Sequence, residues 1–134
     1  MKKKFPLENK AFKNWPGFLP VDALLYKAEY ALAGALLFGL LYLRNSFASL
    51  DVGATVVFAL LPDVVFLAIL PFMRKGKWPS WGANLYNFSH SFVVWVFAVA
   101  VSWLAFNAFF WPILGWALHV CIDRVIGFNL RARK

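Results

Sequence analysis

"WALHVCIDRVIGF", residues 116–128, is the stretch that decides how this chain folds. Most of its positions are apolar enough for a helix inside a lipid bilayer, yet it contains His119, Asp123 and Arg124. On insertion scales an Asp or Arg at the centre of a membrane helix costs roughly 2.5 to 3.5 kcal/mol, so such groups face other helices rather than lipid. The stretch therefore predicts a helix whose polar face lies inside a bundle.

The composition of the whole chain predicts a membrane protein. Of its 134 residues, 62% are apolar and 15% are charged, whereas soluble domains average about half apolar and a quarter charged. Helices need roughly 20 apolar residues to cross the hydrocarbon core, and four segments approach or exceed that length: residues 21–43, 50–72, 84–106 and 108–128. These segments do not alternate as strands do. We expect an all-α, polytopic membrane protein, a four-transmembrane-helix bundle.

The domain organisation follows from these segments. Residues 21–128 form one transmembrane domain, which follows a basic and aromatic cytoplasmic segment, residues 1–20, and precedes a basic tail, residues 129–134. The last two apolar segments are so close in sequence that they predict a tight antiparallel hairpin, with Asn107 and Pro112 near its turn.

The distribution of lysine and arginine predicts the orientation. Basic residues gather before the first apolar segment, at residues 74–77 and at residues 131–134, whereas the remaining loops hold only Arg44. By the positive-inside rule both termini face the cytoplasm, and the protein is a multi-pass protein of the cell inner membrane. The net charge of +8 then describes a surface that attracts anionic headgroups, so membrane lipids and no nucleic acid are the expected partners.

Four polar side chains inside the apolar segments predict a metal site. His119 and Asp123 are four residues apart and share one helix face. His90 lies in the cytoplasmic half of the third segment, and Asp63 lies deeper in the second, near the bilayer midplane. Two imidazoles and two carboxylates form a plausible four-ligand shell for zinc, or part of one for manganese or iron. We expect a divalent metal, with zinc favoured, on the cytoplasmic side of the membrane.

Two further ionisable residues are candidates for catalysis. Glu29 lies in the first apolar segment and could accept a proton from an attacking water. Arg124 lies at the cytoplasmic edge of the last segment, where it could reach lipid phosphates or steady the phosphate of a substrate. Each polar residue also has a structural alternative, because hydrogen-bonded polar groups orient neighbouring membrane helices without any other function.

Three motifs occur in order along the chain: "LPD" at residues 61–63, "YNFSHS" at residues 86–91 and "HVCIDRVIGFNL" at residues 119–130. Together they resemble the PD, YNxxH and HxxxDRxxGY pattern of an uncharacterised bacterial family of small four-helix membrane proteins, a domain of unknown function. Phe128 stands where that pattern has Tyr, so no phenol acts there. The PD, H and HxxxD elements are more loosely similar to bacterial membrane-bound metal-dependent hydrolases. That similarity implies metal ligands at Asp63, His90, His119 and Asp123.

Three classes of function stay open on the sequence alone. The favoured class is a metal-dependent hydrolase that acts on a lipid or on an ester near the membrane. The second is a small transporter, coupled to protons or carrying a metal, in which the chain acts as a homodimer. The third is a structural membrane subunit whose polar residues only join helices.

Overall fold

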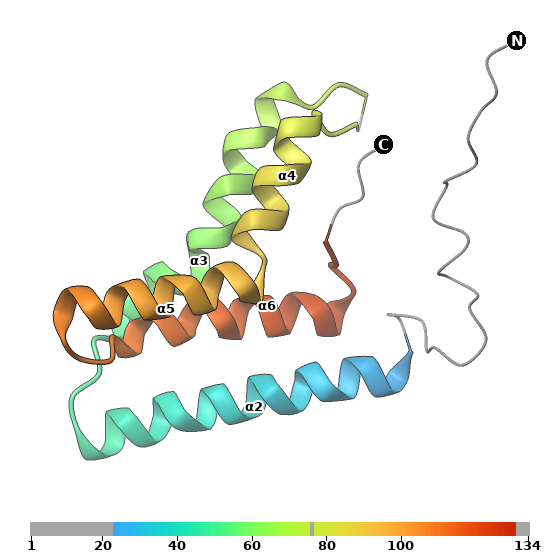
Figure 1. Ribbon diagram of the computed structural model, residues 1–134. Helices are drawn as coiled ribbons and strands as arrows, with labels where there is room; N and C mark the ends of the chain where they lie inside the picture. Colours follow the sequence, from blue (N-terminus) through green and yellow to red (C-terminus); the bar gives the residue numbers. More distant parts are fainter. Residues whose placement is uncertain (1–22, 76, 131–134) are drawn as a thin grey trace, which may run out of the picture.

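The computed structural model describes residues 23–75 and 77–130. Within these residues the chain forms five α-helices and two short 3-10 helices, which confirms the predicted all-helical fold. The predicted segment 1–20 and residues 131–134 of the predicted tail lie outside the described residues. In chain order the elements are α2 (Leu24–Phe47), α3 (Val52–Ile69), η1 (Leu70–Phe72), α4 (Ser80–Ser89), α5 (Phe92–Phe106), η2 (Trp111–Ile113) and α6 (Leu114–Ile126) (Figure 1).

Two helices are long and apolar enough to cross a membrane. α2 has 24 residues, and α3 continues through η1 for 21 residues, Val52–Phe72. At 1.5 Å per residue these lengths correspond to about 36 and 32 Å, against a hydrocarbon core of about 30 Å. Many of their large apolar side chains are exposed, as lipid contact requires. The class of membrane protein is therefore supported, with two spans of full length.

The third predicted segment is not one continuous helix, so that prediction was wrong. The chain forms α4, breaks at His90 and Ser91, and continues as α5 at an angle of 55°. The pair counts as a third span only if the two bent helices cross the membrane together. Two side chains of α6 stabilise the break: the Trp116 indole donates to the carbonyl oxygen of Ser89, and the Arg124 guanidinium donates to that of His90. These side-chain donors replace the backbone donors of a continuous helix.

The fourth predicted segment is also shorter than expected. α6 has 13 residues, about 20 Å of helix, and does not reach across a hydrocarbon core by itself. Before it the chain turns at Asn107, whose φ of 50° is left-handed, and passes through η2. α5 and α6 then lie side by side and antiparallel (Figure 1), so the predicted hairpin is confirmed.

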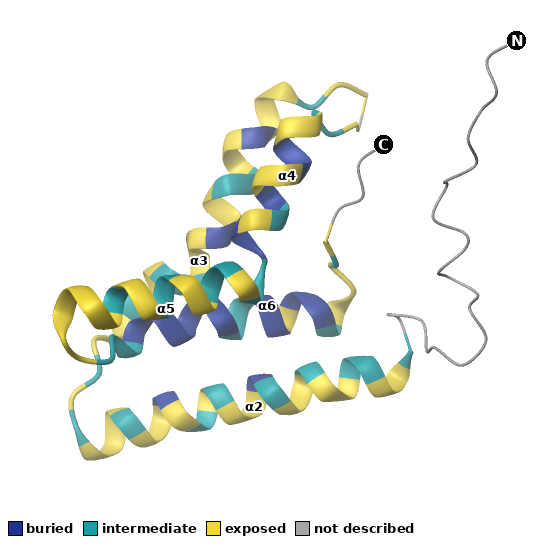
Figure 2. Ribbon diagram, viewed as in Figure 1, coloured by how far each residue is buried: buried dark blue, intermediate teal, exposed yellow. Residues whose placement is uncertain are grey.

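α6 is the central helix of the fold. Most of its residues are buried, whereas α5 has no buried residue (Figure 2). Ile113, Trp116 and Val120 form the core against which partly buried side chains of α3, α5 and the α5–α6 turn pack. α2 and α3 both contact α6 extensively, while α4 lies along the C-terminal half of α3 (Figure 1). The polar face of α6 is therefore enclosed, as the sequence of residues 116–128 predicts.

Gly115 allows the closest approach of two helices at this centre. A Cβ atom added at Gly115 would collide with the carbonyl oxygen of Thr55 and lie 3.2 Å from the amide nitrogen of Ala59, both on α3. Backbone atoms cannot rotate away as a side chain can. Only glycine therefore lets α3 and α6 pack at this distance.

We predict that Gly115→Ala destabilises the protein by about 1–3 kcal/mol, the usual cost of forcing extra atoms into packed helices. The measurement is thermal unfolding of the detergent-purified protein. Gly39→Ala is the matched control, because a Cβ at Gly39 meets nothing within 4 Å and Ala is favoured over Gly in helices by about 1 kcal/mol. Equal unfolding temperatures for Gly115→Ala and the wild type would contradict the described approach of α3 and α6.

Candidate metal centre

Four predicted site residues come together from three parts of the fold. Asp63 lies on α3, His90 follows the last residue of α4, and His119 and Asp123 lie one turn apart on α6. The Nε2 atoms of His90 and His119 lie 3.2 and 3.4 Å from Oδ2 of Asp123. The His119 Nε2 also lies 3.5 Å from Oδ1 of Asp63. The break between α4 and α5 is what places His90 against α6.

His90 is held in place by its own helix. It is fully buried, and its ring stacks on Tyr86 with 3.9 Å between the ring centroids. Its Nδ1 lies 3.0 Å from the carbonyl oxygen of Tyr86 and 2.9 Å from Oγ of Ser89. Because a carbonyl oxygen only accepts hydrogen bonds, this contact favours a proton on Nδ1 and leaves a lone pair on Nε2. A cation between that lone pair and the Asp123 carboxylate would stabilise both groups.

The arrangement fits a metal ion. The Nε2 atoms of His90 and His119 are buried but form no hydrogen bond, although both have a carboxylate oxygen 3.2–3.4 Å away. In a tetrahedral site with bonds of about 2.0–2.1 Å, neighbouring ligand atoms are about 3.3–3.4 Å apart. Asp63, His90 and His119 each offer a ligand atom, and all three atoms lie within 4.8 Å of one another. These three residues could therefore hold a divalent ion. Asp123 is not part of that set, but its Oδ2 lies beside both imidazoles.

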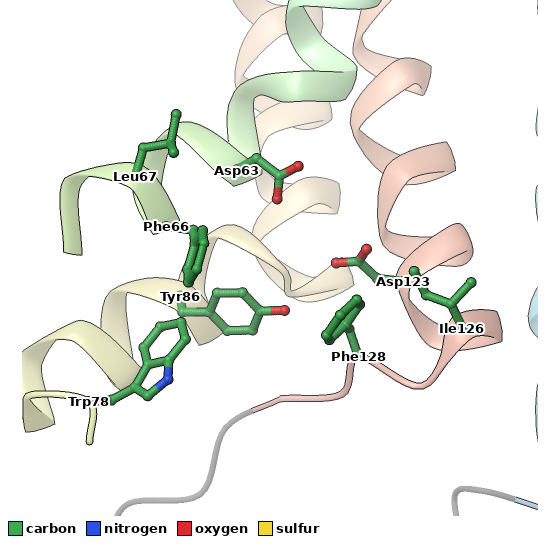
Figure 3. A pocket seen from close by; sticks show the side chains of 8 residues that line it. All are labelled: Asp63, Phe66, Leu67, Trp78, Tyr86, Asp123, Ile126 and Phe128. Atoms are coloured by element: carbon green, nitrogen blue, oxygen red, sulfur yellow. The ribbon is translucent and has the colours of Figure 1, made fainter. Parts of the chain in front are cut away.

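The cluster is closed on one side and open on the other. The side chains of His90, Asp123 and His119 are 0%, 12% and 14% exposed, whereas that of Asp63 is 53% exposed. A pocket of about 520 Å³ begins at this open side. Figure 3 shows Asp63 and Asp123 at one end of it and Trp78 at the other. Its lining is Asp63, Phe66, Leu67, Trp78, Tyr86, Asp123, Ile126 and Phe128.

Arg124 does not have the environment that the sequence led us to expect. It is only 5% exposed, so it does not extend into the headgroup region as predicted. Its guanidinium donates to the carbonyl oxygens of Phe128 at 2.8 Å and His90 at 3.0 Å. Buried guanidinium groups need such acceptors. Arg124 thus positions the helix break beside the cluster and does not line the pocket.

Glu29 lies apart from the cluster. It is exposed on α2, while its neighbours Tyr26 and Tyr30 are partly buried and Tyr30 stacks on Phe92 of α5. The face of α2 that packs against the bundle therefore carries Tyr26 and Tyr30 and not Glu29. The structure does not bring Glu29 together with the other predicted site residues.

Tyr86 is a site residue that the sequence interpretation missed. Its ring is 5% exposed, stacks on His90, and contacts Trp78 edge-on. In Figure 3 its phenol oxygen points toward the part of the pocket near Asp123 and Phe128. Its spacing could have revealed it, because Tyr86 stands four residues before His90 and shares its helix face.

No curated protein and no solved structure matches the chain. The sequence model of one family, described as "Domain of unknown function (DUF4260)", matches residues 23–134. That range includes every helix of the fold and all four clustered residues. The family's description assigns no activity. The match confirms the resemblance to an uncharacterised family, and this chain belongs to the DUF4260 family.

Proposed function

We propose that this protein is a membrane-embedded, metal-dependent hydrolase whose ion is bound by Asp63, His90, His119 and Asp123. One observation carries the proposal. Two buried imidazole nitrogens and carboxylate oxygens from two aspartates converge at 3.2–3.5 Å without hydrogen bonds from either nitrogen. Convergence of several nitrogen and oxygen atoms on one point is the arrangement expected of ligands that share one ion.

The donor set favours zinc. Imidazole nitrogen and carboxylate oxygen together suit a borderline ion, and zinc accepts such a set in tetrahedral geometry. Manganese and iron also accept mixed nitrogen and oxygen ligands. Two carboxylates and two neutral imidazoles balance a divalent charge, which would lower the cost of the buried Asp123 carboxylate in an apolar bundle.

The open side of the cluster supports a reaction rather than a structural role. Catalytic zinc sites keep an accessible position and can expand to five ligands, so a site with four protein ligands would need a fifth position for water, on the side of the exposed Asp63. Here the exposed Asp63 and the adjoining pocket provide access from one side only. A substrate that entered the pocket would therefore meet the cluster at Asp63.

Both the ion and the protein's own side chains would contribute to the reaction. A zinc ion supplies Lewis acidity and allows water to act as a nucleophile near neutral pH. The Asp63 carboxylate, next to the pocket, is placed to accept the proton of that water. The Tyr86 phenol, which projects into the same pocket, is placed to donate to negative charge that develops on an ester carbonyl.

We predict that Asp63→Asn, His90→Ala, His119→Ala and Asp123→Ala each lower the metal content of the purified protein, because each removes one ligand of a shared ion. Elemental analysis of detergent-purified protein measures this, with about one ion per chain expected in the wild type.

Asp51→Asn is the matched control for Asp63→Asn. Both residues lie on or next to α3, but Asp51 only caps the helix by accepting from the Ala54 amide at 2.8 Å. Asn caps helices as well as Asp does, so this variant should retain its metal. A wild-type protein that holds no ion after dialysis against zinc, manganese and iron in turn would overturn the metal site.

We predict that the zinc-loaded protein in phospholipid nanodiscs hydrolyses 4-methylumbelliferyl oleate. Chelation or Asp63→Asn should lower the rate by about a hundredfold, which corresponds to about 2.7 kcal/mol of activation free energy. The fluorescence of released 4-methylumbelliferone measures the rate, and added zinc should restore it only in the wild type.

Two results would argue against hydrolysis. A rate that is insensitive to metal would mean that the ester is cleaved elsewhere or by a contaminant. Uptake of zinc into sealed vesicles that contain the protein, without cleavage of any ester, would favour the second function class, a small transporter.

A further inference from the structure

We propose that the substrate is an anionic amphiphile, whose apolar chain lies against the wall of the pocket and whose anionic group lies at the turn Arg74–Lys77; this rests on the proposed hydrolase function. Three features of the pocket support it. They are its apolar wall, the cationic residues next in sequence to its far end, and the charge balance at the metal end.

The wall of the pocket is apolar and open to the surface. Leu67 and Ile126 are each 61% exposed and Phe128 is 52% exposed, yet all three line the pocket. They lie beside the exposed apolar faces of α3 and α6, which face lipid in a membrane protein. An acyl chain can therefore enter the pocket sideways from the membrane, whereas a polar molecule would gain nothing from this wall.

Cationic residues lie next in sequence to the end of the pocket that is away from the aspartates. Trp78 lines that end, and it directly follows the turn that carries Arg74, Lys75 and Lys77. Backbone hydrogen bonds between Arg74 and Lys77 close the turn. All three cationic residues are exposed. Within the described part of the chain, none of them forms an ion pair with an acidic side chain.

The opposite end offers no free cation to a headgroup, because the buried Arg124 guanidinium there is bonded to the carbonyl oxygens of Phe128 and His90. There the carboxylates of Asp63 and Asp123 balance a divalent ion. An anionic group therefore gains more from the turn, where clustered lysine and arginine attract anionic lipids. α4, whose ten residues span about 15 Å of helix, lies between the turn and His90. This spacing lets a phosphate lie at the turn while a bond further along the molecule reaches the metal centre.

The test is binding of two ether lipids that have no carboxylic ester to cleave: 1-O-hexadecyl-glycerophosphoglycerol, which is anionic, and the matching phosphocholine, which is zwitterionic. Native mass spectrometry of the detergent-purified protein counts metal ions and bound lipid on the same chains. We expect the anionic lipid to bind about tenfold more tightly. Arg74→Gln with Lys77→Gln should remove that preference and leave binding of the phosphocholine lipid unchanged.

A second pair of variants tests the apolar wall. Leu67→Trp fills the pocket and should weaken binding of both lipids by about tenfold, since it takes the space of the chain. Leu61→Trp is the matched control: it makes the same change on the same helix, but Leu61 is exposed and lies outside the pocket. It should bind both lipids as the wild type does.

The outcomes separate the two proposals. Equal affinity for the two lipids would overturn the proposal of an anionic amphiphile as substrate. Unchanged lipid affinity of Leu67→Trp, in protein that retains its metal, would overturn it as well. The proposal would also be overturned if glycerophosphoglycerol, which has no hydrocarbon chain, bound as tightly as the anionic ether lipid. Lipid bound with the expected preference to chains that hold no metal would support the pocket and refute the hydrolase.

Discussion

The need to enclose the ionisable face of α6 is the constraint on which the rest of the structure depends. Asp123 and Arg124 are adjacent on that helix, and both are buried. Neither can face lipid without a large cost. α2, α3 and α5 surround the helix, and Gly115 lets α3 come close enough to bring Asp63 to the cluster. The bundle is therefore arranged around a helix of 13 residues rather than around its longest or most apolar one.

The broken third segment answers the same constraint. A continuous helix would bond the carbonyl oxygens of Ser89 and His90 internally and would carry His90 past α6. Instead Trp116 and Arg124 donate to those oxygens, and the His90 ring stays beside Asp123. In a membrane, irregular backbone persists only where the protein satisfies its polar groups. The same two donors thus stabilise the fold and orient the chain on both sides of His90.

Much of this could be predicted from the sequence, because the signals were local. Hydropathy located α2 and α3, and the spacing of His119 and Asp123 placed both on one face. The break at His90 could not be predicted, since its stabilising donors lie 27 and 34 positions further along the chain than the oxygens they bind. The candidate catalytic roles of Arg124 and Glu29 were inferred from their expected depth in the membrane. Depth does not show which way a side chain faces, because that direction depends on how the helices pack.

Asp123 takes part both in the polar cluster and in the hydrogen bonds that end α6. Its side chain faces both histidines, and its carbonyl oxygen accepts the amides of Gly127 and Phe128 at 3.0 and 2.8 Å. Gly127, with a φ of 103°, then turns the chain so that Phe128 becomes part of the pocket wall. Inserting or deleting one residue here would rotate the residues beyond it by about 100°. A change in the length of this segment would therefore move Phe128 away from the pocket wall, whereas a change of one side chain would leave the backbone path to Phe128 intact.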